Sequence, residues 1–435
     1  MNAQLQRSAW QRRLPLACCL AVAIAGPASA DAVVDWNATY DQAAPAFGSP
    51  PQRVYLGAMM HIAIHDALNS IDRRYETYTV VSPTSHKASP NAAIAAAAHD
   101  VLINQLSRLP ETPEKAAARA TVEARYVAAL AAIPNCLAKR QGIAAGRAAA
   151  ASIIALRRGD GSDTPNLPYT LAPGPGVYQP TAPNFAPPAN AGWARVKPFA
   201  MTRNSQFRSG PSPIFDLTSD AYARDYNEVK QVGDGRVRAA RPDSERSRIA
   251  RYWPGGGANW EAVTRTIAAD RHLNRWQHAR LFALLDMAEA DAAISVFDTK
   301  YRYNFWRPVT AIHWVRDGNA RTASDPDWLP YLVTPPYPDY TCGLPTISGA
   351  ATAVLRHYFR TDAVPYTLAV TIPRAVPLAP ETLTRSYATL SQATAEAADA
   401  RVFAGIHFRT GCVQGVRQGG KVGAFVFQNF LRPLR

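Results

Sequence analysis

Apolar residues recur along most of the chain at the three- and four-residue spacing of helices that are buried on one side. Leu56, Met60, Ala63 and Ala67 form one such stripe, and the three Ala-rich stretches that follow have high helix propensity. A Gly-Asp-Gly sequence at residues 159–161 ends this run. The pattern predicts four helices, over residues 53–71, 91–109, 113–132 and 137–158.

The stretch from residue 164 to residue 213 differs because it contains eleven prolines. Proline lacks a backbone donor and interrupts both helices and central strands, so no continuous element is expected here. Aromatic residues such as Tyr169, Tyr178 and Trp193 are spread through the stretch. They indicate that the segment packs against the body of the protein or covers a site, and that it is not a free linker.

Helical spacing resumes after the Pro-rich stretch, and strand-like alternation is limited to residues 367–371. We predict an all-α fold of two helical-bundle halves joined by the Pro-rich segment. The expected organisation is an N-terminal helical region at 31–160, the Pro-rich connecting or covering segment at 161–215, and a C-terminal helical region at 216–435. The later helices are predicted at 219–232, 244–253, 260–270, 274–300, 348–359, 380–404 and 413–431.

The first thirty residues have the pattern of an export signal. Arg7, Arg12 and Arg13 precede a short apolar stretch at 14–26, and Ala28-Ser29-Ala30 has the form of a cleavage site. The apolar stretch is too short to span a membrane, and no later stretch approaches the roughly 20 apolar residues that a span needs. We therefore predict a signal peptide at 1–30, a periplasmic or secreted protein, and no membrane span.

Composition excludes some classes of protein and leaves the type of partner to the motifs. With 47% hydrophobic and 18% charged residues, the chain is neither disordered nor fibrous. The net charge is +14, but the arginines are scattered and no nucleic-acid motif occurs, so we expect no nucleic-acid partner. Three cysteines lie beyond the signal, Cys136, Cys342 and Cys412, and in an oxidising compartment they predict one disulfide and one buried thiol.

Two pairs of polar residues in the C-terminal half carry candidate chemistry. Lys300 and Arg307 are seven residues apart, which would place both cations on one helix face before Pro308 disturbs the helix. Arg401 and His407 flank Gly405, which can end a helix and let the two side chains converge. Taken alone, the first pair is typical of a solvated helix face and the histidine of a hydrogen-bonded core residue.

A glycine turn lies between these pairs, at residues 338–349. Its Cys342-Gly343 step runs into an Ala-rich helix, so it offers backbone N–H groups and the positive end of a helix to an anion. Elsewhere, His61 and His65 have a spacing that can bind metal, but the glutamate of the zinc-protease motif is missing. We interpret these two histidines as core or helix-interface residues.

In combination, K-x6-R-P, the glycine turn and R-x5-H resemble the vanadium-dependent haloperoxidases. That family shares a superfamily with type 2 phosphatidic acid phosphatases and bacterial acid phosphatases. The likeness extends upstream to residues 197–199, 225–230 and 251–253, and so covers most of the chain from residue 174. The resemblance implies that the cations surround the oxygens of vanadate or phosphate, that the turn donates a backbone N–H, and that the histidine ligates vanadium or attacks phosphorus. The implied residues are Lys300, Arg307, Cys342, Gly343, Arg401 and His407.

The chain departs from the family at three positions. Leu344 stands where the family has the histidine that acts as general acid and base, and leucine cannot transfer a proton. Cys342 stands where a serine is usual, and Gly411 where an aspartate often partners the ligand histidine. The fold would bring Cys342 close to Cys412, so either a disulfide or two buried thiols is expected there. His313 is the best candidate for replacing the missing imidazole.

By resemblance, the expected function is that of an exported haloperoxidase-like oxidoreductase. It would bind vanadate, or phosphate, as its cofactor and oxidise halide with hydrogen peroxide. One alternative is a soluble acid phosphatase that acts on a phosphate ester with His407 as nucleophile. The other is a non-catalytic oxyanion-binding protein, because Leu344 replaces the acid and base.

Overall fold

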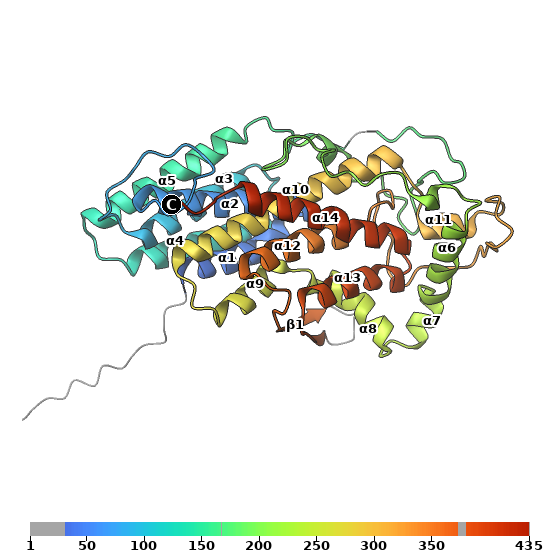
Figure 1. The fold of residues 1–435 in the computed structure, drawn as a ribbon. Coiled ribbons are helices and arrows are strands. Elements are labelled where there is room, and N and C mark those ends of the chain that lie inside the picture. Colours follow the sequence, from blue (N-terminus) through green and yellow to red (C-terminus); the bar gives the residue numbers. More distant parts are fainter. Residues whose placement is uncertain (1–30, 167, 373–379, 435) are drawn as a thin grey trace, which may run out of the picture. The chain divides into compact units, whose positions relative to one another are not determined.

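Helices form most of the structure, a computed structural model that describes residues 31–166, 168–372 and 380–434 (Figure 1). The predicted all-α class is confirmed, and residues 1–30, with the predicted signal peptide, lie outside the described residues. The helices are α1 (Ala32–Ala43), α2 (Pro50–Ile71), α3 (Pro90–Ser107), α4 (Pro113–Ala131), α5 (Leu137–Leu156), α6 (Asp220–Val232), α7 (Gly235–Ala240), α8 (Glu245–Tyr252), α9 (Trp260–Ala269), α10 (Arg275–Tyr303), α11 (Pro308–His313), α12 (Gly343–Phe359), α13 (Leu390–Phe403) and α14 (Arg409–Asn429). Two strands, β1 (Tyr366–Ile372) and β2 (Glu381–Tyr387), form an antiparallel pair.

Polar side chains define where several of these helices begin. Ser89 and Thr112 each accept a hydrogen bond from a backbone N–H in the first turn of the following helix, and proline occupies the first helical position in both. Asn274 starts α10 with a reciprocal capping box that includes Gln277. These local signals explain why the predicted boundaries agree with the structure to within a few residues in this part of the chain.

Helix α10 is the element that the two halves of the fold have in common. It is buried along most of its length and contacts α2 as well as α12 and α14. A single cluster of buried apolar residues extends from Val33 in α1 to Leu431 after α14. None of the described helices is both long enough and apolar enough to cross a membrane.

The predicted helix over residues 380–404 is wrong in its first part. Residues 381–387 form β2 instead, with Leu383 and Tyr387 buried, and α13 starts only at Leu390. The Thr- and Ser-rich sequence of β2 favours a strand when another strand lies beside it, and β1 supplies that partner through the Val370–Leu383 pair. Helices α1, α7 and α11 were not predicted.

The Pro-rich segment is attached to α10 and α5 by hydrogen bonds. The carboxylate of Asp291 in α10 accepts from the backbone N–H groups of Phe199, Ala200 and Met201, at 2.6–2.8 Å. Arg157, just after α5, donates to the carbonyl of Pro198 at 3.2 Å. The predicted packing of this segment agrees with the structure at Tyr178 and Trp193, which are both buried.

Helices α12 and α14 approach each other closely along a glycine stripe on α14. A side chain on Gly415 would place its Cβ 2.7 Å from the carbonyl oxygen of Cys342. A Cβ on Gly419 or Gly423 would collide with backbone carbonyl oxygens of α12. The two backbones are therefore in direct contact, and this contact fixes the start of α12 relative to the start of α14.

Candidate oxyanion site

Lys300 and Arg307 are both fully buried, but they do not share a helix face as predicted. Lys300 lies in the last turn of α10, which ends at Tyr303 before Asn304 in a left-handed conformation. Arg307 caps the start of α11, where Pro308 takes the first helical position that suits proline. The two cations are thus brought together by a break between helices and not by helical periodicity.

Both cations hold the segment that precedes the glycine turn. The Nζ atom of Lys300 donates to the carbonyl oxygens of Pro338 and Asp339, each at 2.7 Å. Arg307 donates from Nε to the carbonyl of Tyr337 at 2.7 Å, and from Nη2 to that of Pro335 at 3.2 Å. Several of their donors are therefore engaged with the protein itself.

The glycine turn leads into α12 as predicted. Cys342 is the residue before the helix and Gly343 is its first residue, so the first backbone N–H groups have no partner within the helix. A Cβ built on Gly343 would meet no atom within 4 Å, so there is open space beside it. An N-terminus with free N–H groups and adjacent space suits an anion.

His407 lies between Arg307 and Asp339 and is 1% exposed. Its Nε2 is 3.0 Å from Nη1 of Arg307, and its Nδ1 contacts Oδ1 of Asp339. Burial, followed by the charges of Arg307 and Lys300, lowers the pKa of His407 well below its usual range, so the ring is neutral. Because a guanidinium can only donate, Nε2 carries the lone pair and Nδ1 carries the proton.

Asp339 supplies a carboxylate partner for His407, although Gly411 stands where an aspartate was expected. It is fully buried, and burial raises its pKa to about 7 although Arg307 and Lys300 act in the opposite direction. A Cβ on Gly411, the position where the family often has aspartate, would lie 3.5 Å from Oδ2 of Asp339. The carboxylate therefore reaches the same place from another segment, and the prediction that His407 has no such partner is wrong.

Arg401 is the third cation of the predicted set. It lies in the last turn of α13 and is 7% exposed, and its charge contributes to the lowered pKa of His407. Within the part of the chain that the structure describes, its buried Nε has no hydrogen-bond partner. The chain turns back after α13 through Gly405, whose φ of +77° is the helix stop that the sequence predicted.

Cys342 and Cys412 are buried and are free thiols in the structure, as is the exposed Cys136. Burial opposes ionisation of Cys342, but the hydrogen bond from Cys412 and the charges of Arg401 and Lys300 outweigh it and lower its pKa. The structure thus describes the two-thiol alternative, and the disulfide stays a prediction.

The missing general acid and base is not replaced by the histidine that the sequence suggested. Nε2 of His313 is 2.6 Å from the carbonyl oxygen of Trp328, and none of its contacts among the described residues joins it to His407. Leu344 follows Gly343 in the first turn of α12. The cluster has three cations, an oriented imidazole and a helix N-terminus, which together suit a tetrahedral oxyanion.

Comparison with solved structures identifies the fold first. A bacterial vanadium-dependent iodoperoxidase structure superposes with a TM-score of 0.75 at 24% identity, covering 92% of this chain and 97% of that one. An apo-type bacterial vanadium-dependent chloroperoxidase structure superposes with a TM-score of 0.69 at 17% identity, covering 87% and 92%. The fold is therefore that of the helical vanadium haloperoxidases.

The sequence comparisons match the C-terminal part of the chain. Residues 280–435 match the family described as the VCPO second helical-bundle domain. Vanadium chloroperoxidase from Curvularia inaequalis is 33% identical over 135 residues, which are 25% of this chain and 22% of that protein. The match thus spans about a fifth of that relative's length. The sequence match is thus confined to the C-terminal part of the chain, and there the resemblance to the vanadium haloperoxidases is confirmed.

Proposed function

We propose that this chain binds vanadate in the cluster around His407 and oxidises a halide with hydrogen peroxide. The observation that carries the proposal is the orientation of His407. Asp339 holds the proton on Nδ1, so the Nε2 lone pair faces the cations. A neutral imidazole whose far nitrogen is held by a carboxylate is the usual form of a metal-ligating histidine.

The other residues of the cluster suit the oxygens of the same anion. Arg401 has a buried Nε with no partner among the described residues, and Gly343 has open space beside its backbone N–H. Lys300 and Arg307 would bind further oxygens with the donors that the carbonyl groups leave free. When bound there, vanadate would supply Lewis-acid activation of hydrogen peroxide.

Leu344 sets the expected rate. A positioned acid and base contributes about 10²–10⁴-fold to a rate, and His313, the histidine that could have replaced the missing one, is bonded to the carbonyl of Trp328 instead. We therefore propose a slow peroxidase.

We also propose, from the sequence alone, that residues 1–30 direct export to the periplasm or outside the cell.

A second candidate is a binding protein for vanadate or phosphate without catalysis. The observations that favour it are Leu344 and the hydrogen bonds by which Lys300 and Arg307 hold backbone carbonyls. In this function the cluster would recognise the anion by charge, and no proton would need to move.

Calorimetric titration with orthovanadate tests both candidates. We expect the wild type to bind, His407→Ala to lose at least ten-fold in affinity, and the control His313→Ala to bind as the wild type does. Equal binding by the wild type and His407→Ala would refute the site. Iodide and bromide oxidation by the vanadate-loaded protein then separates the candidates, because a binding protein shows no turnover.

Leu344→His gives a sharper separation. If the cluster is a peroxidase that lacks only its acid and base, this substitution raises halide oxidation by about 10²-fold or more. An unchanged rate, with vanadate binding retained, favours the binding protein.

A further inference from the structure

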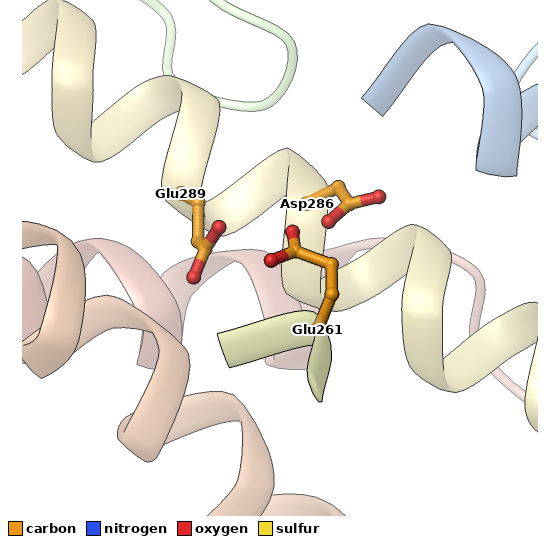
Figure 2. Close-up of side chains that lie close together, drawn as sticks. All are labelled: Glu261, Asp286 and Glu289. Atoms are coloured by element: carbon orange, nitrogen blue, oxygen red, sulfur yellow. The ribbon is translucent and has the colours of Figure 1, made fainter. Parts of the chain in front are cut away.

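Three buried carboxyl groups meet at a second place on α10, away from His407. Asp286 and Glu289 are three residues apart in the middle of α10, and Glu261 reaches them from the first turn of α9. Figure 2 shows the three carboxyl groups pointing toward one another. One ligand oxygen from each lies within 4.8 Å of the others, and the residues are 0–5% exposed.

No positively charged side chain balances this cluster among the described residues. The nearest nitrogen donor is Nδ1 of His61 in α2, which contacts Oδ2 of Asp286. Arg265 in α9 donates instead to Asp41 and Asn37. Buried carboxylates without a counter-charge are strongly disfavoured.

A second observation comes from hydrogen bonding. One oxygen of each group, Oε1 of Glu261, Oδ1 of Asp286 and Oε1 of Glu289, is buried and has no hydrogen-bond partner within the described residues. Buried polar atoms without a partner are rare, and each calls for a donor or an ion. Here three such oxygens converge at one point.

We propose that Glu261, Asp286 and Glu289 form a binding site for a divalent cation of about the size of Ca²⁺. Oxygen is the ligand atom that Ca²⁺ and Mn²⁺ prefer. Oxygens that all lie within 4.8 Å of one another can bind one ion at Ca²⁺–oxygen distances of about 2.3–2.6 Å. Mg²⁺ gives up its water molecules reluctantly, so a fully buried site made of protein carboxylates suits it less well than Ca²⁺.

The position of the site indicates what the cation does. The site joins α9 to α10, and its contact with His61 links it to α2 of the N-terminal half. The backbone of α2 passes close by, since a Cβ on Gly57 would lie 2.8 Å from Oδ2 of Asp286. Glu289 and Lys300 are eleven residues apart on α10, about 16 Å along the helix. The cation therefore stabilises the helix core and is separate from the oxyanion site.

The test uses the full chain, freed of metal with EDTA and titrated with Ca²⁺, Mn²⁺ and Mg²⁺ separately. We expect one equivalent of Ca²⁺ or Mn²⁺ to bind, with Mg²⁺ weaker, and the thermal unfolding midpoint to rise on binding. Glu261→Gln and Glu289→Gln keep the side-chain volume and remove a buried charge, so the metal-free variants remain folded. Each should lose at least ten-fold in cation affinity and most of the rise in the midpoint.

Asp298→Asn is the matched control, because Asp298 lies on the same helix but pairs with Arg208. It should bind the cation as the wild type does. The proposal is overturned if the metal-free wild type responds to none of the three cations, which would mean that the carboxyl groups share protons instead. It is also overturned if the folded Gln variants bind as tightly as the wild type. Orthovanadate titration of the same variants should be unchanged, which keeps this site distinct from the proposed function.

Discussion

Asp339→Asn tests whether the buried carboxylate balances the cations of the oxyanion site. The substitution keeps the volume of the side chain, and its carbonyl oxygen still accepts from Nδ1 of His407. It removes a negative charge that lies 3.9 Å from Arg307, in a place where both side chains are 0% exposed. Lys300 and Arg307 would then be buried cations without that counter-charge.

The expected loss of stability follows from the burial. Removing one partner of a fully buried ion pair costs about 3–5 kcal/mol. The cost should lie at the low end, about 3 kcal/mol, because burial raises the pKa of Asp339 to about 7 and, together with Arg307, lowers that of Lys300 to about 7, so both groups are only partly ionised at neutral pH. Lys300 can therefore give up its proton at neutral pH, which relieves part of the uncompensated charge.

Urea unfolding at pH 7, followed by tryptophan fluorescence, measures the loss. Orthovanadate should restore part of it, since an anion bound at 100 times its dissociation constant contributes about 2.7 kcal/mol. The control is Asp298→Asn, which breaks a pair with Arg208 at side-chain exposures of 12% and 30% and should cost about 1 kcal/mol or less. If Asp339→Asn is as stable as the wild type without an anion, the assigned role of Asp339 is wrong.

Three further outcomes are expected. Gly405→Ala should lower the free energy of unfolding in urea by about 3 kcal/mol or more, because φ is +77° and the new Cβ would lie 2.5 Å from the carbonyl oxygen of Gly233. The control Gly48→Ala has a similar φ of +70° but no atom within 4 Å of the new Cβ, so it should lower that free energy by about 1 kcal/mol. Equal losses in the two variants would contradict the steric argument. Asp291→Ala removes the acceptor of three backbone N–H groups, so trypsin should cleave the Pro-rich segment faster than in the wild type. An unchanged rate of cleavage would show that the other contacts are enough to hold the segment in place. Burial raises the pKa values of Asp286, Glu261 and Glu289, so protons compete with the cation for the same oxygens. Calorimetry should therefore give a lower cation affinity at pH 6 than at pH 8, and equal affinity at the two pH values would contradict this.

Local pattern was sufficient for most of the helices. Their apolar spacing and capping residues act within a few positions, so they can be seen in a single sequence. The strand β2 could not be predicted in this way, because residues 381–387 become a strand only through pairing with β1. The break between Lys300 and Arg307 was also misjudged, since seven residues suggested one helix where the chain turns at Asn304.

The cations of the oxyanion site could be predicted, but the carboxylate of Asp339 beside them could not. Lys300, Arg307 and Arg401 follow from a motif with fixed spacing. Asp339 is visible in the glycine-turn sequence, yet its contact with His407 joins residues 68 positions apart. A signal for the second site was present in the sequence, because acidic residues at 286 and 289 interrupt a long apolar run on a predicted helix.

The glycine stripe of α14 has a consequence for how such a site diverges. Because backbone touches backbone between α12 and α14, the distance from the start of one helix to the start of the other does not depend on the side chains at positions 342 and 344. Cysteine and leucine occupy those positions here without displacing Gly343 from the helix start. Substitutions at positions 342 and 344 can therefore change which groups face the turn without moving the helix start that holds Gly343.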